Sequence, residues 1–359
     1  MSTAESRASE ARPNLLGLEP DALHAALREH FAGRGQPGFR AGQTARWILE
    51  ERATSFEAMT DLPAAERAAL AEAFSMEEPA LAEVQRSRDG TTKHLWRLAD
   101  GELVESVLIP ARDRLTLCIS SQAGCAVGCT FCATGWSGFR RQLDTAEIVG
   151  QYRASQRWAD ENDYGRISNV VFMGMGEPLA NRKGVFPALT LLNAGYGLGA
   201  RKITISTVGL VPGLQELARR PEQFTLALSL HAPNSALRRE LIPMEKRYPL
   251  ADVMAALEAI QALGGRRVTF EYTMIRDVND APELAPELAR LARSIGAFVN
   301  LIPFNPIPWQ HWKPSEPARI RHFQEVLERA GVMVAVREPR GRDIDAACGQ
   351  LRANVVPMV

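Results

Sequence analysis

The stretch RLTLCISSQAGCAVGCTFCATG, residues 114–135, joins an apolar, strand-like run to four of the five cysteines in the chain. The fifth, Cys348, lies near the C-terminus of the 359 residues. The chain begins without the apolar segment of a secretory leader, and no stretch approaches the roughly 18 apolar residues of a membrane span. We therefore expect a cytoplasmic protein with no membrane partner. An odd number of cysteines in that compartment argues against a disulfide framework and favours metal binding or thiol chemistry.

The composition is that of an ordinary globular protein, with 46% hydrophobic and 23% charged residues. The formal net charge is zero, so the overall charge neither predicts nor excludes a nucleic-acid partner. Any basic surface that binds phosphates must therefore be local.

Strand-like runs alternate with helix-like runs from Leu115 onward. Six such units predict parallel strands joined by right-handed crossovers, followed by a closing strand in VMVAVRE, residues 332–338. Six units are too few for an eight-fold barrel, so a partial barrel and an open doubly wound sheet both remain possible. In either architecture the carboxyl ends of the strands carry the chemistry. The strand-like runs are RLTLCIS (114–120), NVVFMGM (169–175), KITISTV (202–208), FTLALSL (224–230), RVTFEYTMI (267–275) and FVNLIPF (298–304).

Composition and periodicity also suggest how the chain divides into domains. The polar start is typical of disorder, and apolar residues at helical spacing predict a small helical domain after it. Two alternating runs around the turn signal Ala-Asp-Gly predict a β-hairpin that links the two parts. We expect a disordered start (1–13), a helical domain (14–80), a hairpin linker (81–114), the strand–helix repeat (115–336) and a mobile tail that carries Cys348 (337–359).

Cys125, Cys129 and Cys132 have the spacing C-x3-C-x2-C and follow the first strand of the repeat. Three thiolates so close together favour a soft metal or an iron–sulfur cluster. A cubane of four irons held at three corners would leave one iron open to a small molecule with an amine and a carboxylate. Structural zinc, with Cys118 or a histidine as fourth ligand, is the alternative. It is less favoured because the chain has no second C-x2-C pair.

These residues resemble the radical S-adenosylmethionine (radical SAM) superfamily, and more narrowly the RlmN and Cfr group of RNA adenine methyltransferases. The resemblance covers nearly the whole chain. It implies an α/β fold, a partial (β/α)6 radical SAM barrel with a small N-terminal helical domain. The motifs that carry it are GC-x3-C-x-FCATG (124–135), GMGEP (174–178), ISTVGLVP (205–212), LSLHAP (228–233), IPFNP (302–306) and DIDAACGQL (343–351).

The resemblance also implies roles for all five cysteines. Cys125, Cys129 and Cys132 would hold a [4Fe-4S] cluster, and two molecules of S-adenosylmethionine would be consumed per turnover. One would methylate Cys348, and the radical formed from the second would remove a hydrogen from that methyl group. The methylene radical would then add to adenine, and Cys118 would release the product by forming a disulfide. Glu105 matches the family's proton acceptor, although a strand glutamate is more often merely solvated.

The strand ends after these motifs would form the S-adenosylmethionine pocket. Small residues would let the backbone approach the substrate amine, and polar side chains would bind its amine, ribose or carboxylate. His231 is placed there by the resemblance alone, because a lone histidine is usually structural. The expected pocket residues are Gly174, Gly176, Glu177, Ser206, Ser229, Leu230, His231 and Asn305.

The implied substrates are 23S ribosomal RNA, at an adenosine of the peptidyl-transferase region, and transfer RNA, at the adenosine 3′ to the anticodon. A low-potential electron donor such as flavodoxin is implied as well. Carbon 2 of adenine is the expected target, carbon 8 is the Cfr-like alternative, and a non-catalytic zinc or redox protein that binds RNA is the rival from another class. Gln142 and Trp136 depart from the family's usual pattern. Candidate phosphate contacts are Arg140, Arg141, Arg201, Lys202, Arg340 and Arg342.

Overall fold

The computed structural model of the chain describes residues 12–262 and 268–353. The start that was expected to be disordered lies outside the described residues, apart from Arg12 and Pro13. None of the helices described is both long and apolar enough to span a lipid bilayer.

The helical front part has its own small core. Leu23, Leu27 and Phe31 recur on one face of the first helix and are fully buried, as the helical spacing predicts. Proline at the first position starts that helix, where no backbone N–H is needed. The elements are η1 (Leu15–Gly17), α1 (Pro20–Gly33), α2 (Phe39–Leu49) and α3 (Ala64–Ala73).

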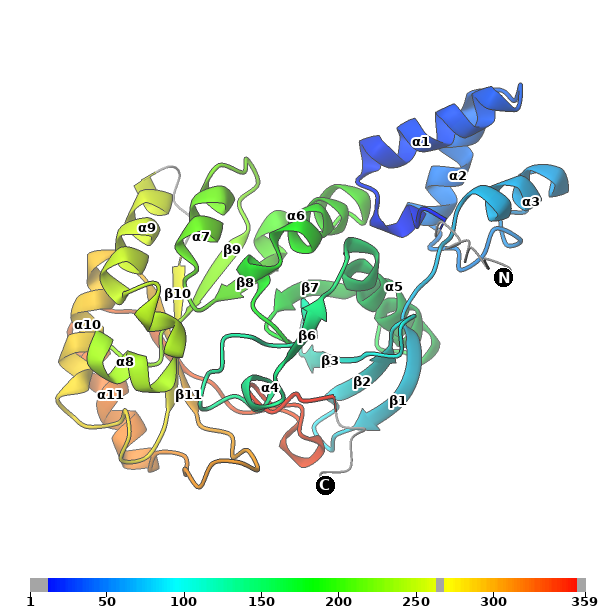
Figure 1. The fold of residues 1–359 in the computed structure, drawn as a ribbon. Helices are drawn as coiled ribbons and strands as arrows, with labels where there is room; N and C mark the ends of the chain where they lie inside the picture. The colour runs from blue at the N-terminus through cyan, green and yellow to red at the C-terminus, as the bar shows by residue number, and fades with distance from the viewer. Residues whose placement is uncertain (1–11, 263–267, 354–359) are drawn as a thin grey trace, which may run out of the picture.

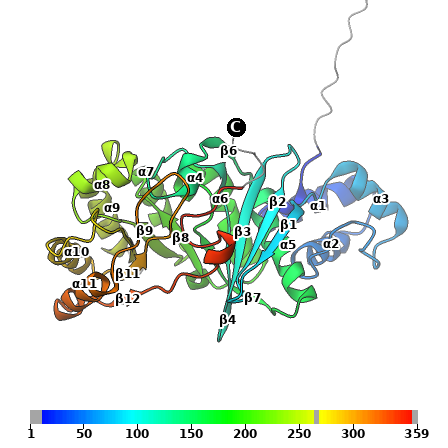
Figure 2. The same ribbon diagram turned by 90° about the horizontal axis from the view of Figure 1, so that it is seen from below.

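A sheet of ten described strands forms the centre of the molecule (Figures 1 and 2). Its order follows the sequence, β1-β2-β3-β4-β7-β8-β9-β10-β11-β12, and the strands from β4 to β12 are parallel. β1 and β12 stand at opposite ends, so the sheet is an open, partial barrel. The strands are β1 (Ala80–Arg86), β2 (Thr92–Arg97), β3 (Leu103–Ala111), β4 (Arg114–Cys118), β7 (Ile167–Phe172), β8 (Ile203–Thr207), β9 (Thr225–Ser229), β10 (Val268–Met274), β11 (Phe298–Pro303) and β12 (Val334–Val336).

The crossover helices cover the outer face of this sheet (Figure 1). The predicted α/β architecture with six strand–helix units is confirmed. The main helices are α5 (Thr145–Glu161), α6 (Arg182–Thr190), α7 (Val211–Ala218), α8 (Ser235–Leu241), α9 (Leu250–Ala262), α10 (Leu284–Ser294) and α11 (Pro317–Arg329). Short elements are α4 (Ala133–Trp136), η2 (Pro178–Ala180), the π-helical η3 (Leu191–Gly195), η4 (Ala200–Lys202), η5 (Pro243–Lys246) and η6 (Arg342–Ile344).

The expected hairpin linker is part of the central sheet instead. β2 and β3 form the hairpin, but β3 also pairs antiparallel with β4, and β1 adds an edge strand that the sequence pattern did not predict. Most of β1 is exposed on both faces, so its residues lack the alternation that reveals a half-buried strand. A second small sheet, β5 (Gln122–Gly124) with β6 (Phe139–Gln142), frames the cysteine segment.

Helix α5 joins the front part to the barrel. It begins with a capping box, in which Asp144 accepts from the Glu147 N–H at 2.8 Å and Glu147 accepts from the Asp144 N–H at 2.9 Å. Further along the helix, the fully buried Arg153 donates to the carbonyl of Ala53 at 2.7 Å and forms an ion pair with Glu78. The buried guanidinium of Arg153 thus connects the helical part to the barrel.

Candidate active site

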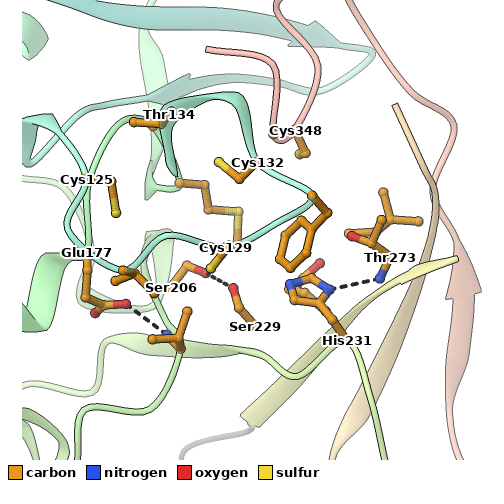
Figure 3. A pocket seen from close by; sticks show the side chains of 18 of the residues that line it. Cys125, Cys129, Cys132, Thr134, Glu177, Ser206, Ser229, His231, Thr273 and Cys348 are labelled. Carbon is orange, nitrogen blue, oxygen red and sulfur yellow. Dashed lines mark hydrogen bonds between the residues drawn. The ribbon is translucent and has the colours of Figure 1, made fainter. Parts of the chain in front are cut away.

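A cavity that is open to solvent lies at the carboxyl ends of the parallel strands. Figure 3 shows its lining side chains converging from β8, β9 and β10, the cysteine loop and the C-terminal tail. The predicted site residues among them are Cys125, Cys129, Cys132, Gly174, Gly176, Glu177, Ser206, Ser229, His231, Asn305 and Cys348.

The cysteine loop is closed by its own backbone. The Cys125 N–H donates to Gly138 at 2.9 Å, and the Cys132 N–H donates to Cys129 at 3.2 Å. Two glycines permit this path: a Cβ on Gly124 would lie 1.9 Å from the Gly138 oxygen, and one on Gly135 would lie 2.8 Å from the Cys129 oxygen. The loop therefore presents three thiols to one end of the cavity.

Burial raises the pKa of Cys125 to about 12, and it raises the pKa of Cys129 well above the ordinary value. Mutual repulsion among the cysteines and the nearby Glu177 contribute to both of these increases. Thiols of this kind become thiolates only when a cation compensates their charge, so the donor set suits an iron–sulfur cluster chemically. Among the described residues, no three His, Cys, Asp or Glu side chains are placed to hold a single metal ion.

Glu177 is the buried acid beside the cysteine loop. Its carboxylate accepts from the Leu179 N–H at 3.0 Å and from the Val208 N–H at 2.9 Å. Burial outweighs these bonds and raises its pKa to about 7. Nearby, the hydroxyls of Ser206 and Ser229 lie 3.4 Å apart at the ends of β8 and β9.

Gly174 and Gly176 were expected to let the backbone approach a substrate amine. Within the protein they serve close packing between loops. A Cβ on Gly174 would lie 2.6 Å from the Ile119 oxygen, and one on Gly176 would lie 2.5 Å from Cβ of Gln122. Gly176 also has a φ of +98°, which side chains rarely adopt. Both glycines bring the GMGEP loop against the segment that leads to the cysteines.

His231 lines the cavity as a neutral ring. Its Nδ1 accepts from the Thr273 N–H at 3.0 Å, which places the proton on Nε2, and its ring centroid lies 4.4 Å from that of Phe131. Burial, with a smaller contribution from Arg238, lowers its pKa to about 3. The neighbouring Leu230 is fully buried and is not among the described residues that line the cavity, so only its backbone is near the site.

Cys348 links two adjoining hollows. It is exposed and lines the main cavity, and it also lines a second pocket that contains Cys118. Both thiols are unpaired in this structure, and Arg337 lines both hollows beside them. Burial, together with the nearness of Cys348, raises the pKa of Cys118 to about 12.

The tail was expected to be mobile, but residues 337–353 are hydrogen-bonded across the mouth of the barrel. Asn305 donates to the Cys348 carbonyl at 3.1 Å and accepts from Arg342 at 3.0 Å. The Ala133 N–H donates to Gly349 at 2.7 Å. Asn305, predicted as a pocket residue, thus also positions the segment that carries Cys348.

Glu105 lies apart from the other predicted catalytic residues. It lines a separate polar pocket, where its Oε1 is 3.1 Å from Nζ of Lys93. Its Oε2 accepts from the N–H groups of Arg352 and Ala353 at 2.8 and 3.0 Å. Both carboxylate oxygens are therefore occupied by a buried lysine and the C-terminal tail.

Four polar lining residues, Thr134, Glu271, Thr273 and Arg337, were missed from the sequence. Oε1 of Glu271 accepts from Asn300 at 2.9 Å, while its buried Oε2 has no hydrogen-bond partner among the described residues. Burial raises the Glu271 pKa. Polar residues at positions 271 and 273 of an apolar strand were the available signal, because alternate residues share one face of β10.

The expected phosphate contacts are scattered. Arg141 is bound by Asp100 and Glu147, which reduces its availability to RNA. Arg201 and Lys202 lie in η4 at the amino end of β8, opposite the cavity, because that helix precedes the strand. Gln142, which departs from the family pattern, accepts from Gln122 at 2.8 Å and donates to the Ala180 carbonyl at 3.1 Å.

Two family models match the chain. The radical SAM superfamily model matches residues 119–286, and the model described as the ribosomal RNA large subunit methyltransferase N-terminal domain matches residues 13–76.

Individual relatives are similar over nearly the full length. A protein from Gemmatimonas aurantiaca named probable dual-specificity RNA methyltransferase RlmN is 52% identical, over 95% of this chain and 94% of its own. The dual-specificity RNA methyltransferase RlmN of Alkalilimnicola ehrlichii is 46% identical over the same shares. The crystal structure of a radical SAM methyltransferase from Sphaerobacter thermophilus superposes with a TM-score of 0.90 at 43% identity, covering 95% of this chain and 100% of that one. The chain therefore belongs to the RlmN family of radical S-adenosylmethionine RNA methyltransferases.

Proposed function

We propose that this protein methylates carbon 2 of an adenosine in 23S ribosomal RNA, and of the adenosine 3′ to the anticodon in transfer RNAs. The observation that carries the proposal is that one cavity gathers the cysteine trio, the polar strand ends and Cys348. The names of the relatives, dual-specificity RNA methyltransferase, support the two RNA classes.

Membership of the radical SAM superfamily implies a [4Fe-4S] cluster and S-adenosylmethionine. In our proposal Cys125, Cys129 and Cys132 hold the cluster, and the polar groups at the strand ends orient the S-adenosylmethionine. When bound, these groups supply a carbon-centred radical that can take hydrogen from an unactivated methyl group. Such chemistry suits carbon 2 of adenine, which is too electron-poor to attack a methyl donor directly. An external low-potential protein such as flavodoxin would supply the electron.

Cys348 is the proposed methyl carrier, so one S-adenosylmethionine provides its methyl group and a second provides the radical. Once the carbon of that methyl group is bonded to adenine, Cys348 holds the base covalently. The Cys118 thiolate then attacks the Cys348 sulfur. The sulfur–carbon bond breaks, the carbon takes a proton, and a Cys118–Cys348 disulfide remains. The shared hollow and the adjacent Arg337 support this pairing, because a guanidinium favours thiolates.

Glu105 is the proposed acceptor of the adenine ring proton. In the tail-docked arrangement its Oε2 is occupied by two backbone N–H groups, so residues 352 and 353 must leave before it can accept a proton. Until then Oε1 of Glu105 stays paired with Nζ of Lys93 at 3.1 Å. Release of the tail would thus make the Glu105 carboxylate available to accept the proton. The same movement would free the segment next to Cys348.

Mass mapping of nucleosides tests the proposed function. RNA from a strain that lacks the gene, incubated with reduced, cluster-loaded protein and S-adenosylmethionine, should yield 2-methyladenosine. A Cys348→Ala protein with the same iron content should yield none. Methyl on carbon 8, or unchanged methylation by the Cys348→Ala protein, would contradict the proposal.

A further inference from the structure

We propose that Trp136 and Trp309 form a base-stacking platform beside the cavity, where a nucleotide next to the target adenosine stacks on the exposed indole. This inference rests on the proposed function, since it assumes an RNA substrate at the mouth of the barrel.

The two indoles form a nearly parallel pair. Their ring centroids lie 6.5 Å apart and their planes differ by 12°. Nε1 of Trp136 donates to the Thr130 carbonyl at 3.1 Å, which fixes the orientation of the ring. The pair is therefore a pre-oriented aromatic surface, and ordering it costs little when a ligand arrives.

Trp136 is unusually exposed for such a residue. All six tryptophans lie within the described residues, and Trp136 is the most exposed of them, at 49%. A large aromatic ring that the fold leaves in water gains free energy when another flat ring covers it. Trp136 thus retains open ring surface although one neighbour already stacks on it.

The platform adjoins the cavity. Trp136 ends helix α4, which starts directly after Cys132, and Thr134 of the same helix lines the cavity. Trp309 follows β11 on the loop that begins with the cavity residues Phe304 and Asn305. Both indoles are therefore only a few residues from the groups that would face the target base.

Positive charge accompanies the aromatic surface. The Arg352 guanidinium, which also pairs with Asp345 at 3.1 Å, lies 5.8 Å from the Trp309 ring centroid. Exposed Arg140 follows Phe139, which is itself 42% exposed. Aromatic faces beside cations are typical of surfaces that bind unpaired nucleotides, where bases stack and phosphates meet arginine. A docking face for an electron-donor protein is the other occupant to consider. RNA is favoured because the Trp136 indole is hydrogen-bonded to the cysteine loop, which lines the cavity that would hold the target adenosine.

The platform can be tested by measuring the Kd of protein variants on RNA variants. The protein is loaded with its cluster but no reductant is added, so that the RNA binds without being methylated. The probe is a synthetic RNA hairpin with one adenosine in its loop as target, compared with versions that are abasic at the nucleotide before or after it. Trp136→Leu removes the aromatic face but keeps an apolar side chain, and Trp136→Phe keeps a smaller ring. Phe39→Leu, which alters an exposed aromatic in the helical part, is the matched control.

We expect Trp136→Leu to raise the Kd of the intact hairpin about tenfold, because this is a typical loss of affinity when one base–aromatic stacking interaction is removed. Trp136→Phe should lie between this and the wild type, and Phe39→Leu should leave the Kd unchanged. On one of the two abasic hairpins, Trp136→Leu should cause no further loss, because the stacked base is already missing.

Two results would overturn the platform. One is an unchanged Kd of the intact hairpin for Trp136→Leu. The other is that Trp136→Leu raises the Kd of both abasic hairpins by the same factor as that of the intact hairpin. The platform would also be overturned if Trp136→Leu bound RNA normally but was reduced more slowly by flavodoxin, while its reduction by dithionite kept the wild-type rate. That result would identify the surface as a docking face for an electron-donor protein. Failure of the reduced wild type to methylate the hairpin or natural RNA would instead overturn the proposed function. Equal iron content and absorbance spectra exclude cluster loss as the cause.

Discussion

At the residue scale, the proposed roles of Cys118 and Cys348 can be tested by trapping the covalent protein–RNA intermediate. Cys118→Ala removes the thiolate that would attack the Cys348 sulfur, so the methylene bridge to adenine should persist. We expect a protein–RNA species on a denaturing gel after one turnover with reduced, cluster-loaded protein. The double variant Cys118→Ala/Cys348→Ala should give no such species. Full product release by the single variant would refute the resolving role.

The high pKa of Cys118 makes product release depend on pH. Burial raises that pKa to about 12, so near neutrality the group is almost entirely a thiol, and each pH unit gives about tenfold more thiolate. In single-turnover reactions the release step should therefore accelerate with rising pH throughout the range that the protein tolerates. A release rate that stays constant between about pH 7 and pH 9 would exclude thiolate attack by Cys118 as the slow step.

Residue roles were only partly predictable from the sequence. The cysteine spacing and the GMGEP loop indicated one site, because each follows a recognisable strand. Glu271 and Arg337 escaped notice because a glutamate within a strand and an arginine after one resemble solvated residues. Their burial depends on which strands become neighbours, and that is a property of the assembled sheet.

At the element scale, helix α5 should depend on Arg153. Its side chain is fully buried between the helical part and the barrel, where it meets Glu78 and the Ala53 carbonyl. Arg153→Ala leaves these groups without a buried donor, so we expect the free energy of unfolding to fall by about 3 kcal/mol in urea titrations.

Arg157→Ala is the matched control for that prediction. Arg157 pairs with the same Glu78, but its side chain is 38% exposed, and exposed pairs contribute at most about 1 kcal/mol. Equal losses for the two variants would show that burial does not set the strength of this connection.

Elements with strong apolar periodicity were predicted and the others were not. The parallel strands are apolar because helices cover them, so each reads as a distinct run. β1 is an exposed edge strand, and β5 and β6 are short, so their formation depends on neighbours rather than on their own pattern. The hairpin was recognised locally, but its pairing with β4 is a long-range contact that no turn signal reports.

At the scale of the whole molecule, His94 should contribute a loss of stability on mild acidification. His94 is fully buried between Trp96 and Trp158, and burial lowers its pKa to about 3. In the unfolded chain this histidine takes up a proton near its ordinary pKa of 6.5, so unfolding is favoured as the pH falls below that value. The slope approaches about 1.4 kcal/mol per pH unit for this one group.

The variant His94→Phe isolates the contribution of His94 to the pH dependence of the free energy of unfolding. The variant keeps a ring of similar size without the titration, so its free energy of unfolding, measured in urea between about pH 5 and pH 7, should fall less steeply than that of the wild type. Identical slopes for the two proteins would show that His94 takes up no proton on unfolding. The buried His231, whose pKa is also lowered, contributes a similar slope in both.

The proposed chemistry depends on three thiolates of one loop holding an iron–sulfur cluster with one iron open to S-adenosylmethionine. Mössbauer spectroscopy of protein reconstituted with ⁵⁷Fe, before and after addition of S-adenosylmethionine, tests this most directly. We predict about four irons per chain, with the signal of one iron site shifted by S-adenosylmethionine and the others unchanged. Four equivalent iron sites that S-adenosylmethionine leaves unaltered, or one bound zinc with no iron, would contradict it.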